Sequence, residues 1–231
     1  MTERRAALAL VGAGLAAVAL GALRTPRSFR VTAGPGEAPR RILSLAVTAD
    51  EILAPLVGAS RLAAVTRFAD DPFISTAAGA IPGSVPRVSA HDPEALLALE
   101  PDLALVAHFT LESAVRLLEA TGTAVVRLAA TRSFDDVEQN LLRVGRAVGE
   151  LPCAEGLARE LQSRLAAVRA RVGARAAPRV LYYSAVGYTA GAGTLVDAKL
   201  TAEGARNVAR EAGLSGFRSV ALELFAALDP E

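Results

Sequence analysis

Aromatic, basic and hydroxyl side chains follow several short apolar segments of this sequence, at the positions where predicted strands end. They are Thr48, Arg67, Phe68, His108, Phe109, Tyr183 and Tyr188. Because ligands of parallel α/β sheets lie beyond the carboxyl ends of the strands, we expect these side chains to line one ligand-binding site. Aromatic residues make up only 4% of the chain, so rings at these positions favour a large conjugated or chelated ligand held mainly by apolar contact.

Residue types that would carry catalysis or hold a metal do not gather in the sequence. A predicted helix and strand separate His91 from His108, and Cys153 is the single cysteine, so neither a spaced metal pair nor a thiolate cluster is expected. Ser184 has no evident His and acid partners, and Gly191–Thr194 lacks the lysine of a phosphate-binding loop. We therefore expect a binding protein, not an enzyme, with no resident cofactor or metal.

Alternating strand and helix patterns must position the predicted site residues. Strands are predicted over 41–46, 63–68, 102–107, 124–128 and 179–183, and helices over 48–56, 92–100, 111–120, 133–148, 196–203, 207–212 and 222–228. Near-continuous apolar strands between helices indicate an α/β fold with parallel sheets. Asp92 and Ser133 are predicted helix caps, and Thr48 with Glu51 is predicted to form a capping box.

One long helix over 152–175 is predicted in the middle of this order. Pro152 and Gly173 are start and stop signals, and an apolar stripe runs between them through Leu157, Leu161, Leu165 and Val168. About 20 helical residues span about 30 Å, the width of a small domain. The helix can therefore join two lobes rigidly.

An internal repeat supports two related lobes. The segment DPEALLALEPD at 92–102 is similar to ALELFAALDPE at 221–231, and aligning the two pairs Glu94 with Glu223. The first copy continues into a strand, whereas the sequence stops after the second copy. We expect two parallel-sheet α/β lobes joined by one long helix, with the second lobe incomplete.

The first residues have the pattern of an export signal. Arg4 and Arg5 precede an uncharged apolar run that ends at Leu23. An uncleaved membrane anchor is the alternative reading of the same residues. The predicted organisation is an export signal or anchor at 1–23, a flexible lead-in at 24–39, an N-terminal lobe at 40–151, the linking helix at 152–175, and a truncated C-terminal lobe at 176–231.

This arrangement resembles the helical-backbone (class III) substrate-binding proteins of bacterial ABC importers, of the ferric siderophore and cobalamin type. The resemblance extends from Arg41 to the end and rests on the order of several stretches: Arg41–Thr66, Arg67–Pro72, Asp92–Val106, the long helix and Gly204–Gly213. It implies a monomer in the periplasm that holds a metal chelate between its lobes. It also implies that Glu94 and Glu223 dock to arginines of the permease in the inner membrane.

Three alternatives remain open from the sequence. The ligand could be haem, with His108 or a tyrosine of the cleft as axial ligand. The chain could be a two-lobed, chelatase-like enzyme, or a membrane-anchored interaction protein. Nucleic acid is not an expected partner, because the formal net charge is +1 and the arginines are scattered.

Overall fold

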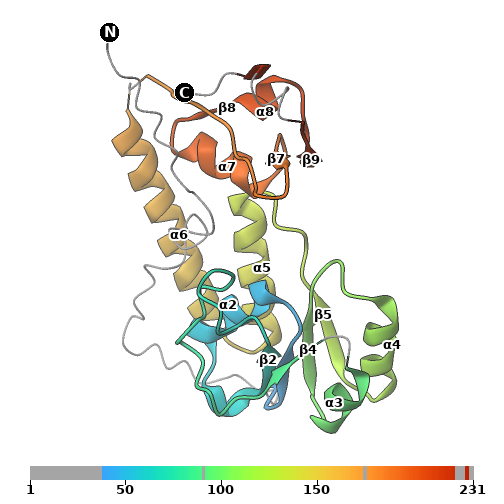
Figure 1. Ribbon diagram of the computed structural model, residues 1–231. Helices are drawn as coiled ribbons and strands as arrows, with labels where there is room; N and C mark the ends of the chain where they lie inside the picture. The colour runs from blue at the N-terminus through green and yellow to red at the C-terminus, as the bar shows by residue number, and fades with distance from the viewer. Residues whose placement is uncertain (1–37, 90–91, 174–175, 222–226, 229–231) are drawn as a thin grey trace.

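A five-stranded parallel sheet forms the centre of the N-terminal unit (residues 38–150) in the computed structural model, which describes residues 38–89, 92–173, 176–221 and 227–228 (Figure 1). The strands lie in the order β3-β2-β1-β4-β5, so the first strand of the chain is the middle one. Their bounds are β1 Ile42–Ser44, β2 Leu62–Thr66, β3 Arg87–Val88, β4 Leu103–Val106 and β5 Ala124–Arg127. This sheet confirms the predicted α/β class.

Helices cover both faces of the sheet, as the near-continuous apolar strands predict. On one face, α2 (Val47–Leu56), α5 (Phe134–Ala147) and α6 (Leu151–Val172) contribute to a core built around Ile42, Val65 and Leu105. On the other face, α3 (Pro93–Ala98) and α4 (Glu112–Ala120) pack on Leu43, Ala104 and Val106. A short 3₁₀ turn, Ala59–Arg61, connects α2 to β2.

Two of the three predicted helix caps are confirmed. The Asp92 carboxylate accepts a hydrogen bond from Ala95 N at 3.1 Å, and Ser133 forms a reciprocal capping box with Asp136. The predicted capping box of Thr48 and Glu51 is wrong. Helix α2 already begins at Val47, because the Ala46 carbonyl accepts the first helical hydrogen bonds, so Thr48 lies inside the helix and caps nothing.

The long helix α6 matches its prediction closely, running from Leu151 to Val172 with Gly173 at its carboxyl end. Gly173 has a φ of 53°, a conformation that glycine adopts without strain. The helix packs on α5 and also contacts α7 of the next unit. A glycine allows the tight contact with α5, since a Cβ at Gly145 would lie 2.3 Å from Ala154 Cβ.

A smaller C-terminal unit (residues 176–221) follows α6 and lies at its far end, above the sheet in Figure 1. It contains one parallel strand pair, one antiparallel pair and two helices. These elements are β6 Arg179–Val180 with β8 Arg206–Asn207, β7 Tyr188–Ala190 with β9 Phe217–Ser219, α7 Leu195–Ala202 and α8 Val208–Glu211. The strand predicted over 179–183 is shorter than expected, and β7 lies outside the predicted strands and helices.

Some predictions fall outside the described residues. They concern the export signal at 1–23, most of the helix at 222–228 and the repeat copy that contains Glu223. Within the described ranges, none of the helices combines the length and apolarity needed to cross a bilayer.

Candidate functional site

The carboxyl ends of the parallel strands face the C-terminal unit. Thr131, in the segment after β5, and Thr48, at the start of α2, line the same cavity as Leu195 and Lys199 of α7. In Figure 1, β5 likewise leads upward to the start of α5, close below α7. Thr48, one of the predicted site residues, therefore lies on the side that faces the second unit.

Two pairs of predicted site residues lie along this edge of the sheet. Arg67 and Phe68 follow β2, and the Arg67 guanidinium lies 4.8 Å from the Phe68 ring centre, a cation–π contact. His108 and Phe109 follow β4, with ring centres 4.9 Å apart in an edge-to-face arrangement. Because β2 and β4 both flank β1, the strands that the two pairs follow are about 10 Å apart.

These aromatic rings are unusually exposed for their size. Phe109 is 77% exposed and Phe68 is 38% exposed. Two further exposed apolar residues, Phe73 and Ile74, lie in the loop after Phe68 and were not predicted as site residues. The signal that could have found them is an apolar pair placed directly after the turn residues of Asp70–Pro72.

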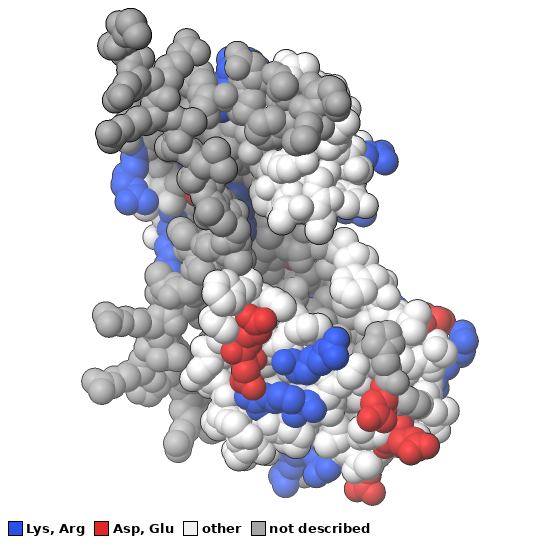
Figure 2. All heavy atoms as spheres, viewed as in Figure 1, with Lys and Arg blue, Asp and Glu red and all other residues white. Residues whose placement is uncertain are grey.

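The C-terminal unit supplies the predicted tyrosines. Tyr183 lies beyond the end of β6 and forms an isolated antiparallel bridge with Thr189, while Tyr188 is the first residue of β7. Both rings are partly exposed, as are Val186 and Phe217, which the sequence reading missed. Figure 2 shows a hollow between the two units whose walls are mostly uncharged on this face. Such walls suit a bulky ligand held by apolar contact.

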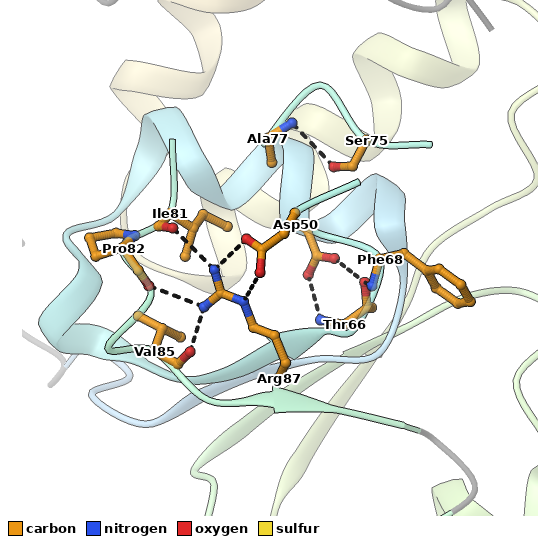
Figure 3. A network of polar contacts seen from close by, with 10 residues as sticks. Asp50, Thr66, Phe68, Ser75, Ala77, Ile81, Pro82, Val85 and Arg87 are labelled. Atoms are coloured by element: carbon orange, nitrogen blue, oxygen red, sulfur yellow. Dashed lines mark hydrogen bonds and ion pairs between the residues drawn. The ribbon is translucent and has the colours of Figure 1, made fainter. Parts of the chain in front are cut away.

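A buried carboxylate supports the loop that carries Phe68. Asp50 of α2 is fully buried and accepts hydrogen bonds from Thr66 Oγ1 at 2.5 Å and from Thr66 N at 3.3 Å. Thr66 Oγ1 in turn accepts from Phe68 N at 3.3 Å, and the Phe68 ring points away from this network (Figure 3). Burial raises the pKa of Asp50 to about 6, although the hydrogen bonds from Ser44 and Thr66 oppose the rise.

An arginine holds the glycine- and proline-rich loop beside β3. The Arg87 guanidinium donates to the carbonyls of Ile81, Pro82 and Val85, and it pairs with Asp70 at 2.6 Å (Figure 3). The hydrogen bond from Arg87 lowers the pKa of Asp70. This fork joins the loop of residues 78–87 to Asp70, at the start of the Asp70–Pro72 turn.

A partly enclosed cavity of about 160 Å³ lies where the two units meet. Its lining comes from α2, the start of α5, the middle of α6 and α7. The lining residues are Thr48, Glu51, Ile52, Pro55, Thr131, Phe134, Val137, Leu141, Leu157, Leu161, Arg164, Leu195 and Lys199. Of the predicted site residues, Thr48 belongs to this lining, whereas the predicted aromatic residues lie outside it.

The remaining predictions concern metals and docking. Glu94 is exposed in the first turn of α3, and Glu223 lies outside the described residues. Within the part of the chain that the structure describes, no group of three His, Cys, Asp or Glu side chains is close enough to hold a metal ion.

Comparison with known proteins gives consistent matches. A family model described as periplasmic binding protein matches residues 42–231. A cobalamin-binding protein of Halobacterium salinarum is 28% identical over 196 residues, which cover 84% of this chain and 53% of that protein. The chain thus spans about half the length of the curated relatives it matches.

Solved structures share the fold. A periplasmic haem-binding protein from Pseudomonas aeruginosa has a TM-score of 0.67 and 29% identity, covering 83% of this chain and 70% of that one. The periplasmic haem-binding protein RhuT from Roseiflexus sp. RS-1 has a TM-score of 0.71 and 25% identity, covering 83% and 74%. A periplasmic vitamin B12-binding protein of Vibrio cholerae, at 22% identity and a TM-score of 0.65, shares the fold over 84% of this chain and 74% of that one.

Proposed function

Because the chain belongs to the periplasmic binding protein family, we propose that it captures a ferric siderophore or cobalamin between its two units and delivers it to the permease of an ABC importer. The observation that supports the proposal is the set of exposed aromatic rings in both units. Phe68 and Phe109 belong to the N-terminal unit, and Tyr183 and Tyr188 belong to the C-terminal unit. Exposed aromatic residues in both units favour a large ligand with extended apolar surface.

Arg67 gives this site its polar component. Its guanidinium lies over the Phe68 ring and would pair with a carboxylate or another anionic group of a chelate. The name of the Halobacterium salinarum relative supports cobalamin within the proposed ligand class.

Haem is the second candidate ligand, and a specific feature favours it. His108 is exposed beside Phe109, and Tyr183 and Tyr188 are partly exposed in the opposite unit. Imidazole and phenolate groups are axial ligands of haem iron. The names of the Pseudomonas aeruginosa and Roseiflexus structures support this candidate.

Delivery would use the two predicted docking carboxylates. We propose a division into an N-terminal lobe at 40–151, a backbone helix at 152–175 and a C-terminal lobe at 176–231, acting as a monomer. With Glu94 on the first lobe and Glu223 on the second, the distance between the two acids would report lobe closure to permease arginines.

Residues 1–23 would direct export to the periplasm, or anchor the chain in the membrane if they are not cleaved.

Absorbance identifies the ligand directly. Purified protein is incubated in turn with cobalamin, haem and a ferric hydroxamate, separated from free ligand, and scanned for each chromophore. We expect one class to remain bound with a saturable titration. Retention of none of the three, by protein shown to be folded, would contradict the proposal. A shifted haem Soret band that His108→Ala abolishes would select the haem candidate over the other two.

A further inference from the structure

We propose that the cavity between α2, α5, α6 and α7 is a second binding site, which takes a small neutral aromatic molecule of about one ring. The walls come from both units: Ile52, Leu141 and Leu161 belong to the N-terminal helices and α6, and Leu195 belongs to α7. Ile52, Leu141 and Leu157 are themselves buried, so these walls are part of the packed core.

The size of the cavity separates it from the proposed chelate site. Pockets for drug-sized ligands have volumes of roughly 300–1,000 Å³, whereas this cavity has about 160 Å³. An apolar cavity of about 150 Å³ in another protein stays dry and binds benzene. A metal chelate would not fit here, but one aromatic ring would.

The charges at the cavity balance, which favours a neutral ligand. Glu51 and Lys199 both line it from opposite units. The Glu51 carboxylate accepts from Thr76 N at 2.8 Å and from Thr76 Oγ1 at 2.9 Å. Arg164, the third charged residue, pairs with Glu160 on its own helix. A charged ligand would meet one group of its own sign and one of the opposite sign, and would gain little from them.

Two hydroxyl groups give the cavity a small polar element. Thr48 and Thr131 line it, and Thr131 Oγ1 accepts a long hydrogen bond of 3.4 Å from Asn140 Nδ2. A ligand with one hydroxyl or ring N–H could donate to such an oxygen while its ring fills the apolar part. Phenol-like molecules therefore match the lining better than ionic ones.

A ligand at this position would contact both units at once. Leu195 and Lys199 belong to α7 of the C-terminal unit, whereas the other lining residues belong to α2, the segment before α5, α5 and α6. Binding would therefore favour the relative placement of the units seen here over others.

Fluorine NMR with 4-fluorophenol as the probe tests the proposal on the full chain. We expect saturable binding with a dissociation constant of about 1 mM or lower, a range that a one-ring ligand filling an apolar cavity can reach. Val137→Phe places a ring in the cavity and should weaken probe binding at least tenfold. If this variant does not fold, Leu195→Phe fills the cavity from the opposite wall and should weaken probe binding by the same amount. Ala167→Leu, on the exposed side of α6, should leave binding unchanged.

Two further measurements test whether the probe binds in this cavity and not at the chelate site. Leu161→Ala enlarges the cavity and should admit 2-naphthol, which the unmodified protein should exclude. A saturating chelate, once identified, should not displace 4-fluorophenol. The proposal is overturned by absence of saturable probe binding, by binding that neither phenylalanine variant weakens, or by displacement of the probe by the chelate. The first two of these results do not depend on whether a chelate binds at the exposed rings.

Discussion

Asp50 Oδ2 lies 2.5 Å from Thr66 Oγ1, so a fully buried carboxylate joins the first turn of α2 to the last residue of β2. Phe68 N donates to the same hydroxyl. One hydrogen-bonded unit thus connects the core of the N-terminal unit with the loop that carries the exposed Phe68 ring.

Replacing Asp50 by Asn should change how stability depends on pH. Burial raises the pKa of Asp50 in the folded state to about 6, above its unfolded value. Well below pH 3.8 the carboxyl is protonated in both states and costs nothing, whereas above pH 6 its ionisation in the folded state costs about 3 kcal/mol. Relative to Asp50→Asn, the unmodified protein should lose stability as the pH rises from 4 through 6.

Urea unfolding of both proteins at pH 4 and pH 8 measures this difference. We expect similar free energies of unfolding at pH 4 and a more stable Asn variant at pH 8. A difference of the same size at both pH values would show that ionisation of Asp50 is not its cause.

Arg87→Lys should destabilise the loop of residues 78–87 even though it keeps the positive charge. Lysine lacks the planar fork that reaches the carbonyls of Ile81, Pro82 and Val85. We expect a loss of about 1–3 kcal/mol in chemical unfolding, because the partly buried carbonyls of Ile81 and Val85 lose their donors. Asp70→Asn should have a smaller effect, since the Asp70 side chain is largely exposed. A larger loss of stability in Asp70→Asn than in Arg87→Lys would show that the ion pair, not the hydrogen bonds to the carbonyls, stabilises the loop.

Gly145→Ala and Gly156→Ala should have opposite effects on stability. A Cβ at Gly145 would lie 2.3 Å from Ala154 Cβ and would push α5 and α6 apart, whereas a Cβ at Gly156 meets nothing closer than 3.9 Å. We expect a loss of about 1–3 kcal/mol for the first substitution and a gain of about 0.5–1 kcal/mol for the second. Thermal and urea unfolding measure both, and equal effects would contradict a close α5–α6 contact.

Phe68→Ala should weaken binding of the chelate that the absorbance assay identifies. Truncating an aromatic contact residue costs about 1–3 kcal/mol, which corresponds to a tenfold or greater rise in the dissociation constant. Phe68→Leu keeps apolar volume but loses the cation–π contact with Arg67, so its loss should be intermediate. Ser163→Ala, on the exposed side of α6, is the control. Unchanged affinity in Phe68→Ala would remove Phe68 from the site.

Local signals in the sequence predicted the elements whose ends they define. Pro152 and Gly173 placed α6 to within a few residues, and Asp92 and Ser133 placed the starts of α3 and α5. These signals act within one turn of helix, so no tertiary information is needed to use them.

Contacts between residues far apart in the sequence explain why the local signals in α2 were misleading. Glu51 stands three residues after Thr48, as a capping box requires, but its carboxylate accepts from Thr76, far along the chain. Asp50 likewise has the place of an ordinary acid in a first helical turn, and only the packing of α2 on β2 makes it a buried, hydrogen-bonded group. Sequence spacing cannot reveal either partner.

Very short strands, and a cavity lined by several helices, also could not be predicted from the sequence. Strands β3, β7 and β9 have two or three residues each, too few for an alternating pattern to be recognised. The cavity has walls from four helices, so no single segment carries its signal. The edge position of Arg67, Phe68, His108 and Phe109 was predictable, because it follows from where parallel strands end.

The strand order has a consequence for how the chain matures during synthesis. β1 is the first strand to be synthesised, but one of its two neighbours is β4, with Ile42 paired to Leu103. About 60 further residues must therefore leave the ribosome before β1 can pair on that side. During that interval a newly made strand has an open backbone edge that invites binding by a holding chaperone. A sheet of this order therefore closes late, only after β4 has been made.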